Sequence, residues 1–97
     1  MRKIHLQIAA EQDLLDIWQY SRKQWNAAQA DSYLDDLDRG MQLLARNPES
    51  GLKRDHIRPG YRAQFIKSHV VYYTVTPTTI HIIRVLHDRM DPNRHLT

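Results

Sequence analysis

The residues best suited to chemistry gather near the end of the chain, in the stretch RVLHDRMD at 84–91. Cleavage of RNA by its own 2′-hydroxyl needs no metal, but it needs a general base, a general acid and a cation for the developing phosphorane charge. Arg62 and Arg84 could supply the cation, and His87 or His81 could act as acid or base near neutral pH. Ribonuclease chemistry is therefore one hypothesis, although it depends on residue types and not on a tight spacing.

Other kinds of site find less support. His87, Asp88, Asp91 and His95 are metal-ligand types at short spacing, but Pro92 interrupts any helical register that would align them. The chain has no cysteine, its serines stand in no glycine-framed nucleophile turn, and its three glycines are too far apart for a phosphate loop. We expect no metal and no cofactor.

Composition and charge define the setting of these residues. The chain has 97 residues, 41% of them hydrophobic and 26% charged, which suits one soluble domain over residues 1–97. We expect a cytoplasmic protein, because cysteine is absent, no apolar stretch approaches about 18 residues, and the N-terminus is unlike a signal peptide.

The net charge of +3 is unevenly divided. Residues 1–50 contain six basic and eight acidic residues, whereas residues 51–97 contain eight basic and three acidic residues. The basic half is expected to face an acidic partner, which could be nucleic acid or an acidic protein segment, unless it is simply a solvated surface.

Hydrophobic periodicity predicts the elements of the first half. Residues 3–9 alternate as in a short half-buried strand, and from Glu11 the period changes to that of a helix that includes Trp18 and Trp25. Asn26 offers the N-cap of a second helix, whose apolar stripe ends at Asn47 and is expected to pack in the core. Two helices joined by so short a break predict an antiparallel hairpin.

The second half predicts a sheet. After a loop over residues 47–60, three segments rich in β-branched and aromatic residues predict strands at 61–67, 69–76 and 79–86. Their short connections require antiparallel neighbours. The prediction is an α+β fold with the order β-α-α-β-β-β, in which the helical hairpin packs on one face of a small antiparallel sheet and leaves the other face partly open.

Alternation along the last strand places one charge on an apolar face. Ile80, Ile82, Arg84 and Leu86 are expected to share that face. A buried, unpaired arginine is costly, so we expect Arg84 to be paired, at the rim or used in function, with Arg62 as a candidate neighbour.

Two tryptophans suggest an apolar surface that could bind a partner protein. Trp18 and Trp25 are seven residues apart and therefore share one face of the expected first helix. They are either core residues or the wall of a groove for a partner's helix or strand.

The order of elements, together with the segments DLLDIWQYS, PGYRAQFIKSHVVYYTV and IHIIRVLHDRMDPNRHL, resembles the ParE branch of the ParE/RelE toxin superfamily over nearly the whole chain. The resemblance implies the RelE/ParE-like fold and a bacterial type II toxin–antitoxin module, of the kind that arrests growth and stabilises plasmids or chromosomal regions. In that family ParE-like toxins block DNA gyrase and so replication, whereas RelE-like relatives cleave mRNA on the ribosome. An acidic ParD-like antitoxin wraps its C-terminal segment round the toxin and silences it.

Carried over to residues, the resemblance favours a gyrase inhibitor without a reaction of its own. Arg62 and Arg84 fall where RelE-like nucleases place phosphate-binding arginines, but those nucleases usually end in a tyrosine or a histidine–tyrosine pair, and nothing aromatic follows Tyr73 here. A ribosome-dependent mRNA endonuclease using Arg62, Arg84 and His87 stays as the alternative, and a non-toxic antitoxin-binding domain as a second one. We expect a hetero-oligomer with the antitoxin and no binding of nucleic acid by the chain alone. The residues expected to bind antitoxin or target are Trp18, Trp25, Arg58, Arg62, Arg84, His87, Arg89 and Met90.

Overall fold

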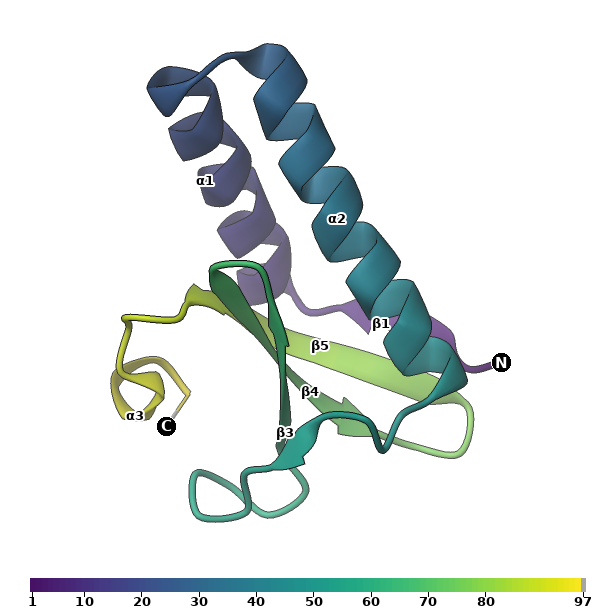
Figure 1. Cartoon of the computed structure of the whole chain (residues 1–97). Helices are drawn as coiled ribbons and strands as arrows, with labels where there is room; N and C mark the ends of the chain where they lie inside the picture. Colours follow the sequence, from purple (N-terminus) through teal and green to yellow (C-terminus); the bar gives the residue numbers. More distant parts are fainter. Residues whose placement is uncertain (97) are drawn as a thin grey trace.

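The computed structural model describes residues 1–96. Its elements in chain order are β1 (Lys3–Leu6), α1 (Ile8–Gln24), α2 (Ala27–Arg46), β2 (Leu52–Lys53), β3 (Arg62–Ile66), β4 (His69–Val75), β5 (Thr79–His87) and α3 (Pro92–His95). The strands form one sheet in the order β1-β5-β4-β3-β2, in which β1 is parallel to β5 and all other neighbours are antiparallel. The predicted α+β fold is confirmed: α1 and α2 form a hairpin on one side of the sheet (Figure 1).

The hairpin covers one face of the sheet through the predicted apolar stripe of α2. Its N-cap is the expected one, because Asn26 Oδ1 accepts the Gln29 N–H at 2.8 Å. Leu37 and Leu44 are almost completely buried in one cluster with Tyr73 of β4. Full burial of each such side chain contributes about 1.5–3 kcal/mol, so this cluster is the main core. No helix in residues 1–96 has both the length and the hydropathy needed to cross a membrane.

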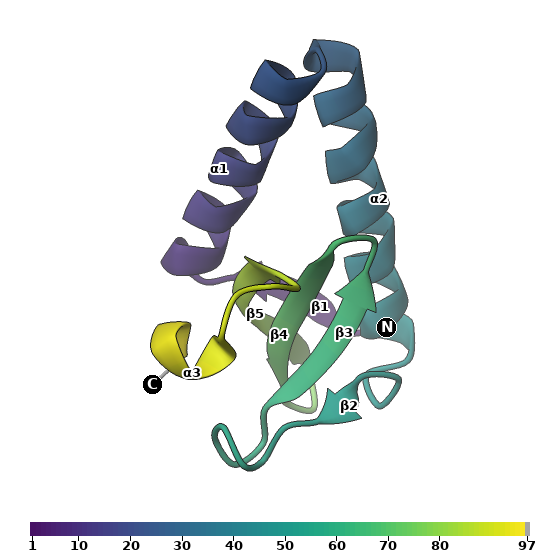
Figure 2. The same ribbon diagram turned by 60° about the vertical axis from the view of Figure 1, so that its left-hand side comes forward.

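A smaller cluster lies on the other face. It contains Ile57, Ala63, Val70, Tyr72, Leu86 and Leu96. Its cover comes from the loop before β3 and from the C-terminal segment, where Asp91 caps α3 by accepting the Asn93 N–H and Leu96 is only 6% exposed. Figures 1 and 2 both show α3 apart from the hairpin. The C-terminal segment therefore packs on the sheet, because the Leu96 side chain is buried there.

The structure differs from the prediction at the junction of β1 with α1 and in the connection between α2 and β3. The first strand ends at Leu6 instead of residue 9, and Ile8, expected to be half-buried, starts α1 with 85% of its surface exposed. The segment expected to be pure loop contains β2, which pairs with the start of β3. The chain is anchored just before β2, because the Tyr73 hydroxyl accepts the Gly51 N–H at 3.0 Å and donates to the Pro48 carbonyl at 2.8 Å.

A β-bulge interrupts the last hairpin of the sheet. Tyr73 is paired with Ile82 whereas Tyr72 is paired with Arg84, so Ile83 is an extra residue on β5. Beyond the bulge, Val85 joins the main core and Leu86 turns to the opposite face. The predicted common face of Ile80, Ile82, Arg84 and Leu86 is therefore wrong after Ile82, because one inserted residue reverses the alternation.

Candidate functional site

Arg84 is paired with Asp13, at the start of the helical hairpin. Its Nε and Nη2 donate to the two carboxylate oxygens of Asp13 at 2.7 and 2.8 Å, and its Nη1 donates to the His95 carbonyl at 3.2 Å. Asp13 also accepts the Val85 N–H at 2.9 Å. The adjacent carboxylate raises the pKa of Arg84, whose side chain is 23% exposed. Of the roles predicted for Arg84, pairing is the one observed, and this Asp13–Arg84 clamp joins α1, β5 and the C-terminal segment.

Arg62 is bound at a different place. Its Nη1 donates to the carbonyl oxygens of Gly51 and Glu49, at 2.8 and 3.3 Å, in the connection between α2 and β2. Arg62, the candidate neighbour of Arg84, holds a separate segment, because backbone carbonyls satisfy its guanidinium whereas a carboxylate satisfies that of Arg84.

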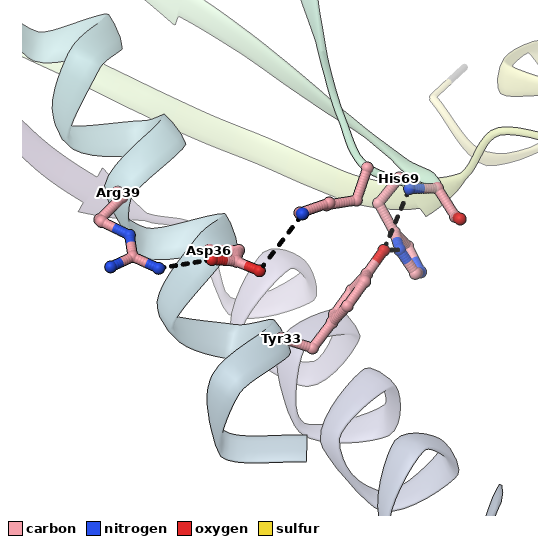
Figure 3. Close-up of polar contacts among 6 residues, drawn as sticks. Tyr33, Asp36, Arg39 and His69 are labelled. Carbon is pink, nitrogen blue, oxygen red and sulfur yellow. Dashed lines mark hydrogen bonds and ion pairs between the residues drawn. The ribbon is translucent and has the colours of Figure 1, made fainter. Parts of the chain in front are cut away.

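His87 has an imidazole neighbour that the sequence analysis did not single out. It lies opposite His69 in the β4–β5 pairing, with ring centres 5.3 Å apart and ring planes at 79°. We call His69 and His87 the imidazole pair. His69 Nδ1 is 2.6 Å from the hydroxyl of Tyr33 on α2, and this hydroxyl also accepts the Ser68 N–H at 3.2 Å (Figure 3). On the other ring, His87 Nδ1 is 3.0 Å from Asp88 Oδ1 and 3.1 Å from the Arg89 amide nitrogen.

A cavity of about 160 Å³ adjoins the imidazole pair. It lies among the end of α1, the first half of α2, the start of β4 and the end of β5. Its lining residues are Tyr20, Ser21, Trp25, Tyr33, Ser68, His69 and His87. Burial lowers the pKa of His69, and the neighbouring His87 lowers it further. Burial also raises the pKa of Tyr33. At neutral pH the site therefore contains an uncharged His69 beside an uncharged phenol, which can exchange protons but offers no fixed cation.

The remaining predicted residues lie on three segments of the chain: α1 and its end, the loop before β3, and the turn after β5. Trp18 donates from Nε1 to Asp31 of α2 at 2.8 Å and has the Arg22 guanidinium 5.8 Å from its ring centre. Trp25 follows the end of α1 and is 64% exposed, so the two tryptophans do not continue one helical face. Arg58, Arg89 and Met90 are exposed, the first in the loop before β3 and the other two after β5.

Three residues of the site were missed: Asp13, Tyr33 and His69. Asp13 and Tyr33 belong to helical patterns that predict only where a helix lies, and their partners are 71 and 36 residues away in the sequence. His69 could have been found from the pairing of the two last strands only if the bulge at Ile83 had been known.

Solved structures share this fold. The chromosomal ParDE toxin–antitoxin system from P. aeruginosa contains a chain that matches 90% of this chain and 96% of its own length with a TM-score of 0.78 and 19% identity. YafQ from E. coli matches 91% of this chain and 94% of its own length with a TM-score of 0.57 and 16% identity. At these identities the likeness concerns the fold.

Sequence relatives are closer. Toxin ParE1 of Mycobacterium tuberculosis (strain ATCC 25618 / H37Rv) is 43% identical over 89 residues, which are 91% of each chain. Toxin ParE1 of Caulobacter vibrioides is 38% identical over 96 residues, which are 99% of each chain. The family model described as the ParE toxin of the type II toxin–antitoxin system parDE matches residues 4–92 and confirms the resemblance noted in the sequence. This chain therefore belongs to the ParE family and is a toxin of the type II toxin–antitoxin class.

Proposed function

We propose that this toxin acts by binding DNA gyrase, without a catalytic reaction of its own, and that an acidic ParD-like antitoxin neutralises it. The observation that carries the proposal is the hydrogen bonding of the two arginines that a nuclease mechanism would need. Arg84 directs three donors to Asp13 and His95, and Arg62 donates to two backbone carbonyls. A cation that stabilises a phosphorane must face the scissile phosphate, whereas Arg84 is paired with a carboxylate and Arg62 directs Nη1 to two backbone carbonyls.

Exposed residues of the basic half, together with Trp25 at the end of α1, supply the contact surface in this proposal. Arg58 and Arg89 are exposed, and Met90 and Trp25 are 46% and 64% exposed. Charge-assisted hydrogen bonds from the arginines would fix an acidic partner, and the two large apolar side chains would be buried on binding. An antitoxin segment that orders only on binding can cover such scattered residues.

The test combines purified protein with cells. The chain should inhibit DNA supercoiling by purified gyrase, and tightly controlled expression should cause filamentation and the DNA-damage response while translation initially continues. Co-expression with the antitoxin should remove both effects.

Arg89→Ala with Met90→Ala should weaken gyrase or antitoxin binding, whereas Arg39→Ala on α2, whose side chain is 72% exposed, serves as the exposed control. Prompt mRNA cleavage with normal supercoiling would refute the gyrase proposal. Antitoxin binding without toxicity would identify a non-toxic binding domain.

A second candidate function is cleavage of mRNA on the ribosome, and the imidazole pair favours it. The sequence offered His87 without an acid/base partner, and His69 stands 5.3 Å from it, ring centre to ring centre. Two imidazoles can act as general base and general acid. Under this candidate, His69→Asn and His87→Asn would each abolish toxicity and ribosome-dependent cleavage without changing gyrase inhibition. Full toxicity of both variants would exclude it.

A further inference from the structure

The net charge of the chain is concentrated in the connection between β2 and β3. Residues 53–62, which we call the basic loop, contain one acid, Asp55, and four basic residues, Lys53, Arg54, Arg58 and Arg62. Their net charge is +3, which equals that of the whole chain, so the other 87 residues contain ten basic and ten acidic residues. Charge of one sign gathered in so short a segment makes a local field that attracts polyanions.

The cations of the basic loop have no carboxylate partner. Elsewhere in residues 1–96, carboxylates form ion pairs with Arg39, Lys67 and Arg84, but within this part of the chain none pairs with a basic residue of the loop. The acid of the loop has another role, because Asp55 Oδ1 accepts the Gly60 N–H at 2.8 Å. The positive charge of the loop is therefore not neutralised inside the described part of the protein.

The basic loop is fixed in shape before any partner binds. The Arg54 N–H donates to the Tyr61 carbonyl at 2.8 Å, and the Tyr61 N–H donates to the Arg58 carbonyl at 3.1 Å. Gly60 permits the turn, because its φ of +86° lies in the region that favours glycine. Ile57 is only 8% exposed and anchors the loop in the smaller apolar cluster. A preformed set of cations loses less conformational freedom on binding than a flexible one.

The basic loop also lies where a large partner can reach it. Figures 1 and 2 both show the connection from β2 to β3 extending beyond the sheet, away from the turn between α1 and α2. The half of α2 that follows this turn is acidic and contains Asp31, Asp35, Asp36 and Asp38. The molecule is therefore positive at one end and negative towards the other, so a polyanion would approach the loop first.

The side chains of the basic loop suit closely spaced phosphates better than an acidic protein or single-stranded RNA. Protein interfaces bury large apolar anchors, and none of the exposed large apolar side chains of residues 1–96 lies in 53–62. Single-stranded RNA is recognised by stacking its bases on aromatic rings, whereas the one aromatic residue of the loop, Tyr61, packs against the smaller cluster. Duplex DNA presents a dense row of phosphates that can be bound without contact to its bases.

We propose that the basic loop binds the phosphate backbone of double-stranded DNA without reading its sequence. The inference goes beyond the proposed gyrase inhibition, and it departs from the expectation that the chain alone binds no nucleic acid. With three or four phosphate contacts, the affinity should fall with salt concentration with a double-logarithmic slope of about −3 to −4. Arg58 also belongs to the surface proposed for the acidic antitoxin, so the antitoxin and DNA are alternative partners of this residue.

The test is a titration of a short fluorescent DNA duplex of arbitrary sequence with the full chain at low salt, followed by fluorescence anisotropy. Lys53→Gln with Arg58→Gln should reduce the salt slope by about 2 and weaken binding by at least about tenfold. Arg22→Gln with Lys23→Gln is the matched control, because it removes the same charge from exposed residues in the last turn of α1. This control should keep the affinity within about twofold. Circular dichroism confirms that each variant is folded.

Two further measurements locate the contact and identify the class of ligand. In nuclear magnetic resonance spectra, DNA should shift the backbone amide signals of residues 53–62 and leave those of the first half of α2 in place. In competition, the duplex should bind more tightly than single-stranded RNA or an acidic peptide of equal charge, because its charge density is higher. Tighter binding of the RNA or the peptide, amide shifts centred elsewhere, equal loss in the control variant, or no binding at low salt would each overturn the proposal. Neither measurement contains gyrase, so a failure here is distinguishable from a failure of the proposed gyrase inhibition.

Discussion

Loss of the carboxylate at Asp13 should destabilise the whole protein, because that side chain is the centre of the Asp13–Arg84 clamp. It accepts two hydrogen bonds from Arg84 and one from the Val85 N–H, and its side chain is 12% exposed. Asp13→Asn keeps the shape but removes the charge, so a partly buried guanidinium loses its counter-ion. Breaking a fully buried pair costs about 3–5 kcal/mol. With 23% of the Arg84 side chain in contact with solvent, we expect about 2–3 kcal/mol and a fall in Tm of roughly 10–20 °C.

Urea denaturation followed by circular dichroism measures this loss of unfolding free energy. Asp16→Asn is the matched control on the same helix, because Asp16 is exposed and accepts a hydrogen bond from the exposed Gln12 side chain. This substitution should change the unfolding free energy by less than about 0.5 kcal/mol. In a double-mutant cycle with Arg84→Met, the two changes should couple by at least about 1 kcal/mol. A loss below 0.5 kcal/mol for Asp13→Asn, or strictly additive changes in the cycle, would show that the clamp contributes little and would refute this reasoning.

Three further predictions concern the core and its ionisable groups. Folding lowers the pKa of His69 from its ordinary 6.5, so the unfolded chain binds a proton at this residue more readily than the folded chain does. The unfolding free energy should therefore fall as the pH drops below about 6.5. In urea titrations between about pH 7.5 and 5.5, His69→Gln should flatten this dependence. Tyr73→Phe leaves the Gly51 N–H and the Pro48 carbonyl without their partner and should cost about 1–3 kcal/mol, with no loss if water replaces the hydroxyl completely. Gly40→Ala should destabilise the protein, although alanine favours a helix over glycine by about 1 kcal/mol, because the new methyl group meets the Ile66 side chain. Adding Ile66→Val should recover most of the lost stability. Equal stability of the single and double variants would contradict this account.

Local patterns predicted α1, α2 and four of the five strands in their order, because each of these elements carries its own periodicity, but they did not predict β2 or α3. The stripe of α2 and its cap at Asn26 could be placed from one sequence, since both depend on residues a few positions apart. The same patterns could not predict the Asp13–Arg84 clamp. Asp13 has the position of an ordinary acidic residue near a helix start, and its partner depends on how the hairpin is set over the sheet.

The imidazole pair shows where this limit is sharpest. Counting back along β4 and β5 from the observed pair of Val75 and Ile80, an uninterrupted antiparallel register sets His69 opposite Leu86. The extra residue Ile83 moves the pairing by one position, so that His69 meets His87 instead. Ile83 itself does not mark a bulge, because β-branched residues favour regular strands.

The bulge and the clamp are physically connected. Asp13 accepts the backbone N–H of Val85, the second residue after Ile83, as well as the Arg84 side chain between them. β1 pairs with β5 only as far as Ile82, and beyond that point a carboxylate from α1 accepts a backbone N–H of β5. The arginine that looked like a catalytic cation in the sequence is therefore part of what stabilises an irregular strand. That irregular strand in turn brings together two histidines 18 residues apart, so the clamp and the imidazole pair are connected through the register of the sheet.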